Sequence, residues 1–145
     1  VVYNFDNGAA SLVDAATALS LQPTAKHEYF VMAPVFENGM TVIGDTSKFV
    51  TMADMRIPSV DADGDFLRVG VTASEAESPI ITGYAATPPA GVEAENTPLE
   101  ETSSVDRLKA AKSGWYWDDQ SKLWCVKLDF AGAKEMTTKT FRLQK

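Results

Sequence analysis

A cluster of aromatic side chains has the type and spacing that could bind a sugar. Trp115, Tyr116 and Trp117 are consecutive, and Trp124 follows shortly after them. In an extended strand Trp115 and Trp117 point to one face and Tyr116 to the other. Two indole rings on one face, with Tyr84 as a further member, could form a platform that stacks on the apolar face of a pyranose. The alternative is that these rings fill a core or an interface, because aromatic side chains each bury about 150–250 Å².

Three aspartates could offer oxygen ligands to Ca²⁺: Asp61, Asp63 and Asp65. An EF-hand loop that began at Asp61 would need Gly at its sixth position and Glu at its twelfth. This chain has Phe66 and Thr72 there, so the EF-hand pattern fails. A tight hairpin centred on the Asp-Gly pair explains the same residues, and a weak site for Ca²⁺ on the three carboxylates is the alternative.

No set of residues in the sequence forms a recognisable catalytic constellation. His27 is the sole histidine, and no nucleophilic serine or cysteine motif lies near it. Gly-x-Ser-x-Gly and Gly-rich phosphate-binding motifs are absent. Cys125 lies between Trp124 and Val126, which favours a buried structural thiol over a reactive one. We therefore predict no catalytic residue and no cofactor.

The charge of the chain argues against two classes of partner. Its net charge is −7, and its 13 Lys and Arg residues are scattered among 20 acidic residues without a basic cluster. Nucleic-acid binding requires basic side chains that replace phosphate counterions, and an anionic membrane surface attracts basic segments for a similar reason. The sequence also has no apolar run near the ~20 residues that a membrane span needs. Neither nucleic acid nor a membrane is an expected partner.

The residue pattern predicts that short β-strands separated by turns position these side chains. The run from Leu67 to Val71 alternates apolar and polar side chains, which is typical of a half-buried strand. The apolar run from Glu28 to Val35 predicts a strand covered on both faces, and the Asn38-Gly39 pair predicts a hairpin after it. Further expected strands are 1–5, 17–21, 41–43, 56–60, 79–84, 114–117, 123–130 and 139–143.

Two segments depart from this strand pattern. Thr87 to Ser104 is rich in Pro and Glu, which predicts a mobile acidic excursion. Val105 to Lys112 has apolar residues at helical spacing and predicts a short helix. Many short strands at regular intervals predict an all-β fold, an antiparallel β-sandwich with at most one or two short helices. We expect one such domain over residues 1–145.

Several strand patterns resemble a known group of enzymes. The segments His27 to Val35, Met40 to Asp45 and Lys48 to Met52 resemble strands of the raffinose synthase and plant-type α-galactosidase group of glycoside hydrolases. Later segments are similar to further strands of that group and to its closing hairpin; they are Arg56–Val60, Leu67–Val71, Ile81–Tyr84 and Trp117–Val126. The likeness lies in strand patterns, not in catalytic signatures.

The resemblance implies a C-terminal β-sandwich domain that follows a (β/α)₈ catalytic barrel acting on galactosyl oligosaccharides. The catalytic aspartates of that group belong to the barrel, which needs about 250 residues, so none can be assigned in this chain. The expected role is a non-catalytic accessory domain whose partner is the barrel of the same polypeptide. Such a domain should expose apolar surface where the barrel would cover it.

Two other functions are compatible with the same sequence. The chain could be an autonomous carbohydrate-binding module that holds an oligosaccharide on Trp115, Trp117 and Tyr84. It could also be a sandwich of the cell-surface adhesion type; the acidic net charge and the expected fold are the features that favour this alternative.

Overall fold

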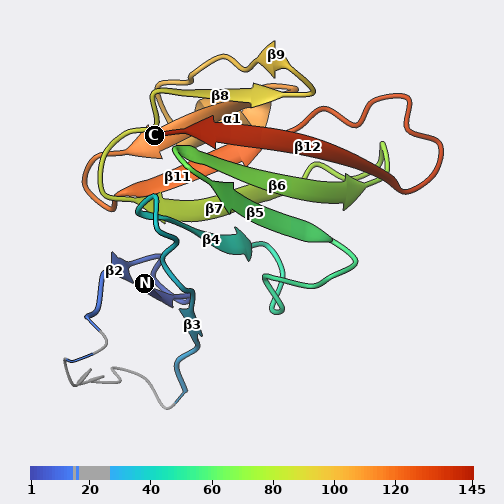
Figure 1. Cartoon of the computed structure of the whole chain (residues 1–145). Helices are drawn as coiled ribbons and strands as arrows, with labels where there is room; N and C mark the ends of the chain where they lie inside the picture. The colour runs from blue at the N-terminus through green and yellow to red at the C-terminus, as the bar shows by residue number, and fades with distance from the viewer. Residues whose placement is uncertain (15, 17–26) are drawn as a thin grey trace.

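The chain folds into three antiparallel sheets, shown by a computed structural model that describes residues 1–14, 16 and 27–145 (Figure 1). The five-stranded sheet has the order β5 (Ser59–Asp63), β6 (Phe66–Ala73), β12 (Thr137–Gln144), β8 (Gly91–Ala94), β9 (Thr97–Pro98). The four-stranded sheet has the order β10 (Gly114–Asp118), β11 (Leu123–Lys127), β7 (Ile80–Ala85), β4 (Met40–Asp45). The three-stranded sheet has the order β2 (Ala10–Ser11), β1 (Val2–Asn4), β3 (Phe30–Met32).

The two larger sheets pack face to face around one apolar core. Leu67, Val69 and Val71 of β6 are fully buried, as the alternation in the sequence predicts. Trp124 of β11 and Phe141 of β12 are also fully buried, and their rings meet edge to face with centroids 6.0 Å apart. Since β11 and β12 belong to different sheets, this contact crosses the interior. The predicted all-β antiparallel sandwich is confirmed.

The three-stranded sheet packs on the outer side of the four-stranded sheet. Val42 of β4 belongs to the sandwich core, whereas its neighbour Ile43 packs in a second cluster with Tyr3 of β1. Val31 of β3 and Leu123 of β11 join that cluster. Strand β4 therefore carries apolar side chains on both faces, and all six of its residues are buried.

The predicted short helix is present as α1 (Val105–Ala110). Ser104 caps its first turn, because the Ser104 hydroxyl accepts a hydrogen bond from the Arg107 backbone N–H. At the other end the buried Lys127 ammonium donates to the Lys109 and Ala111 carbonyls at 2.6 Å and 2.7 Å. These bonds satisfy carbonyl groups that a helix end leaves free, so α1 is fastened to β11.

Two predictions about the strands are wrong. The run from Glu28 to Val35 contains only the short edge strand β3, and Met32 is 79% exposed, so the run is not covered on both faces. Gly39 closes a turn at φ 81° as expected, but β3 and β4 do not pair, because β4 pairs with β7 instead. For the range 47–52 the residue pattern fits a strand and one helical turn equally, and the structure shows turns and bends there.

The segment from Thr87 to Ser104 is not an unstructured excursion. It contains β8 and β9, and β8 pairs with β12 in the interior of the five-stranded sheet. Val92 is 4% exposed and faces the core, while Glu93 points outward. The predicted strand over 17–21 lies outside the described residues.

Gly83 in β7 makes room for the core tryptophan, so its substitution tests the packing of the two sheets. A Cβ at this position would lie 2.1 Å from Trp124 Cζ2 and 2.2 Å from the Thr41 carbonyl oxygen. We expect Gly83→Ala to lower the free energy of unfolding by about 2–3 kcal/mol, measured by urea denaturation. Gly91→Ala is the matched control, because a Cβ there meets nothing within 4 Å. Equal stability of the two variants would contradict this packing.

Candidate functional site

The structure does not assemble the predicted aromatic platform. Trp115 is 5% exposed within the sandwich core, and Tyr84 is 8% exposed. Trp117 is half-buried; its indole N–H donates to the Ala85 carbonyl at 3.3 Å, and the Lys122 ammonium lies 5.0 Å from its ring centroid. Two of the three rings therefore have no free face for a sugar, and Trp115 follows the alternative of a core residue.

The three candidate aspartates are not brought together as metal ligands. Asp61 and Asp63 lie on β5 with carboxylates 3.4 Å and 3.6 Å from the Arg68 guanidinium. Asp65 is exposed in the two-residue turn between β5 and β6, where Gly64 has φ 55°. Over 1–14, 16 and 27–145, no three His, Cys, Asp or Glu side chains group as a metal site. The acidic segment forms the hairpin that the sequence predicts, one residue later than expected.

Two other residues singled out in the sequence line none of the pockets described for residues 1–14, 16 and 27–145. Cys125 is half-buried on β11, with its sulfur 3.8 Å from the Thr82 hydroxyl. Burial is the main cause that raises the pKa of this thiol, so Cys125 stays protonated at neutral pH. His27 is exposed. Within the described part of the chain, no helix is long and apolar enough to cross a membrane.

A transverse row of four charged side chains crosses the outer face of the five-stranded sheet. Asp61 lies opposite Arg68, Arg68 opposite Arg142, and Arg142 opposite Glu93 in the strand registers. Residues directly opposite in an antiparallel pair share one face, and this face is the outer one because Leu67 and its alternate neighbours fill the core. The row thus runs from β5 through β6 and β12 to β8.

The two arginines at the centre of this row are held by different partners. Arg142 donates to the Glu93 carboxylate at 2.6 Å and stacks over the Phe66 ring at 4.3 Å. Among the residues that the structure describes, Arg68 has only the longer contacts to Asp61 and Asp63, and its side chain is 40% exposed. Like charges directly opposite on a sheet destabilise it by up to about 1 kcal/mol. The flanking carboxylates offset this repulsion.

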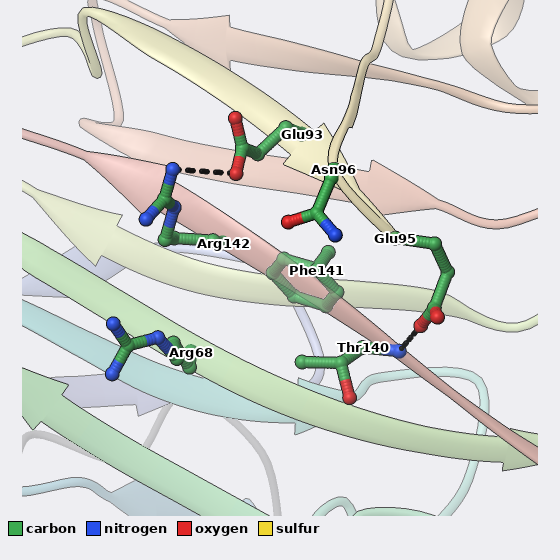
Figure 2. Close-up of a pocket in the computed structure, with 7 residues that line it drawn as sticks. All are labelled: Arg68, Glu93, Glu95, Asn96, Thr140, Phe141 and Arg142. Carbon is green, nitrogen blue, oxygen red and sulfur yellow. Dashed lines mark hydrogen bonds and ion pairs between the residues drawn. The ribbon is translucent and has the colours of Figure 1, made fainter.

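A hollow of about 330 Å³ opens beside these arginines, and we call it the outer-face hollow (Figure 2). Its lining residues come from β6, β12, β8 and the turn after β8; they are Arg68, Glu93, Glu95, Asn96, Thr140, Phe141 and Arg142. Figure 2 shows Arg68 and Arg142 on neighbouring strands, with Glu93 paired to Arg142 and Glu95 bound to the Thr140 backbone. The hollow is therefore built mainly from polar groups of adjacent strands.

The turn between β8 and β9 holds two of these residues in an uncommon conformation. Glu95 and Asn96 have φ values of 49° and 63° and are the central residues of a two-residue hairpin loop. Hairpin loops of this kind favour Asn-Gly or Asp-Gly, and a non-glycine residue held in a sparsely populated region costs about 1–3 kcal/mol. One oxygen of Glu95 accepts from the Thr140 backbone N–H at 2.6 Å.

Sequence reasoning missed the outer-face hollow although one signal for it was present. The segment Gly91–Ala94 alternates Val92 and Ala94 with Glu93, which is the pattern of a half-buried strand. The acidic composition around it favoured a loop prediction instead. The register that aligns Glu93 with Arg142 depends on pairing between distant strands, which the alternation alone does not specify.

A second surface feature is an apolar groove of about 340 Å³ lined by Lys48, Val50, Ala53, Met55, Arg56 and Met136. Met55 is 82% exposed, Val50 63% and Met136 53%. Next to it Phe49 is 70% exposed and stacks on Tyr29, with ring centroids 4.5 Å apart. Large apolar side chains are normally buried. A group of them at the surface is typical of a site that another molecule or domain covers.

An ion-pair network holds the loop that carries the groove. The Arg56 side chain lies 3.5 Å from the buried Asp45 carboxylate, donates to the Thr72 carbonyl at 2.6 Å, and pairs with Glu77. Asp45 also accepts from the Ser47 hydroxyl at 2.6 Å. The hydrogen bond from Arg56 is the main cause that lowers the pKa of Glu77.

Comparisons with known proteins give a limited result. No protein-family model and no curated protein sequence matches the chain. Among solved structures, a GH31 dextranase mutant of Flavobacterium johnsoniae complexed with isomaltotriose is similar, with a TM-score of 0.45 and 16% identity over 59% of this chain. The same dextranase complexed with glucose gives the same values, and the match covers 12% of that enzyme's chain. At this TM-score we base no argument on the likeness.

The lowered pKa of Glu77 predicts how the Arg56 network responds to acid. Stability that depends on a lowered carboxyl pKa is present above the ordinary pKa of about 4.3 and is lost as the pH falls through the folded-state pKa. We therefore expect Glu77→Gln to be less stable than the parent at pH 7, with a difference that shrinks below about pH 4. Thermal unfolding at several pH values measures it. The exposed Glu37→Gln is the control, and a difference independent of pH would contradict the assignment.

Proposed function

We propose that this chain is a non-catalytic accessory domain of a carbohydrate-active enzyme and that it docks through the apolar groove onto the catalytic barrel of the same polypeptide. Two observations support this proposal. The strand segments of the sequence resemble the C-terminal sandwich of a glycoside hydrolase group. The exposed apolar surface that such a role requires is present around Val50, Met55 and Met136.

The observation that carries the proposal is that the loop beside the groove is held in place while its apolar side chains stay exposed. Asp45 donates its backbone N–H to the Thr51 carbonyl at 2.9 Å, and Thr51 is 4% exposed. Gly44 has φ 108°, and a Cβ there would lie 2.2 Å from that same carbonyl oxygen. A loop anchored in this way keeps Val50 and Met55 at the surface, ready to be covered by a partner.

The arrangement of ionisable groups supports a non-catalytic role. Glu77 and Asp118 are carboxyls whose pKa is lowered, and local bonds from Arg56 and Ser121 are the largest causes of these shifts. Both shifts favour the charged carboxylate, whereas a general acid needs a raised carboxyl pKa. Neither of these two carboxyls therefore has the raised pKa that a general acid needs.

The accessory role predicts which methionines become covered in the complete enzyme. The five methionines are Met32, Met40, Met52, Met55 and Met136. With ¹³C-methyl labels and a soluble paramagnetic agent, we expect Met55 and Met136 to be relaxed strongly in the isolated chain and protected in the complete polypeptide. Met32 is 79% exposed on the three-stranded sheet and should be relaxed in both the isolated chain and the complete polypeptide. Met40 is 2% exposed and should be protected in both.

Equal relaxation of Met55 and Met136 in the isolated and complete proteins would overturn the docking proposal. Protection of Met32 alone would overturn it too, because that result would place the contact on the three-stranded sheet.

A further inference from the structure

We propose that the outer-face hollow binds one sugar unit of a neutral saccharide. This goes beyond the accessory role, because the hollow lies on the outer face of the five-stranded sheet and shares no residue with the apolar groove. The inference is carried by the charge balance of the hollow, its unpaired polar groups, and the unfavourable local geometry that builds it.

The charge balance selects a neutral ligand. Arg68 and Arg142 stand side by side and would attract an anion if they were alone. Asp61, Asp63 and Glu93 contact them directly, and Glu95 adds another carboxylate at the rim. Four carboxylates around two guanidinium groups leave no excess of positive charge, so an acidic ligand would be repelled.

The polar side chains of the hollow that make no bond within the protein suit a ligand with several hydroxyls. Among the described residues, the Asn96 amide and the Thr140 hydroxyl are exposed and make no hydrogen bond within the protein, and one oxygen of Glu95 binds the Thr140 N–H while the other makes no such bond. An amide and a hydroxyl each donate and accept, and a carboxylate accepts. Sugar hydroxyls also both donate and accept, so neighbouring hydroxyls of one ring match this mixture of groups.

Two unfavourable local arrangements converge on this hollow. Glu95 and Asn96 occupy positive φ values in a turn that favours glycine at its second position. Arg68 and Arg142 are like charges placed directly opposite each other. Local strain of this kind collects at binding sites, where it fixes side chains in the geometry that a ligand needs. Here it places Glu95 and Asn96 at the hollow that Thr140 also lines (Figure 2).

The size and lining of the hollow set the expected strength of binding. A volume of about 330 Å³ is at the lower end of the range for small-molecule sites, which fits a single pyranose. Phe141 is among the lining residues, but its ring is buried in the core against Trp124, and Arg142 covers the Phe66 ring, so no aromatic face is free to stack on the sugar. We therefore expect a dissociation constant on the order of 1 mM or weaker.

Backbone NMR titration of the whole chain with neutral trisaccharides of glucose, galactose and mannose tests the proposal. At about 20 mM sugar, at least one trisaccharide should shift the amide signals of Arg68, Glu95, Asn96 and Thr140 while those of Val50 and Met55 stay unchanged. A galacturonic acid trimer should leave them in place. The proposal is overturned if no neutral trisaccharide shifts these signals, or if the acidic trimer alone does so.

Paired variants separate binding from folding. Asn96→Gly supplies the residue that the turn favours, so we expect unchanged or higher thermal stability together with binding weakened about fivefold. Thr140→Val removes a hydroxyl inside the hollow and should weaken binding similarly. Thr138→Val removes a hydroxyl on the same strand and face outside the hollow, bonded to Thr72 at 2.7 Å, and should leave binding unchanged. Full binding by both Asn96→Gly and Thr140→Val would overturn the proposal.

This test is independent of the accessory role, which is read from the methyl groups of Met55 and Met136. Either proposal can therefore fail while the other stands.

Discussion

The contact between Trp124 and Phe141 is the interaction on which the rest of the structure depends. It places the largest fully buried side chain of the four-stranded sheet against a ring of the five-stranded sheet. Gly83 allows it, because any side chain at that position would occupy the space of the indole. Once this contact is made, the odd-numbered side chains of β12 around Phe141 face inward and the even-numbered ones face outward.

That alternation creates the surfaces on which both functional proposals rest. Because Phe141 and Leu143 are buried, Thr140 and Arg142 must lie on the outer face. The pairing of β12 with β6 on one side and β8 on the other then brings Arg68 and Glu93 into the same row. The apolar groove has a different origin, since it belongs to a connecting loop that the buried Asp45 and Arg56 hold in place.

The sequence predicted the parts of the fold that depend on local pattern. Alternation identified the inward face of β6, and the Asp-Gly pair identified the turn that follows β5. The core alternative for Trp115 was also correct: although β10 is an edge strand, the Trp115 ring packs in the sandwich core, where an aromatic side chain gains from burial.

The parts that failed depend on partners far away in the chain. The apolar run before Val35 reads as a covered strand, but β3 lies at a sheet edge and exposes Met32. Acidic composition concealed β8, whose pairing with β12 supplies half of the outer-face hollow. No local pattern indicates that Glu93 will stand opposite Arg142, because that register is fixed by two strands about fifty residues apart.

The proline in β9 has a consequence for how this protein can associate with others. Leu99 donates its backbone N–H to Val92 of β8, so the alternate position, Pro98, directs its nitrogen to the free border of the sheet. A proline nitrogen carries no hydrogen, so an incoming strand would find no donor there. The opposite border, β5, displays Asp61 and Asp63, and charged side chains discourage strand addition as well. Both borders of the five-stranded sheet therefore discourage the addition of a strand from another molecule, which favours contact through the face of this sheet.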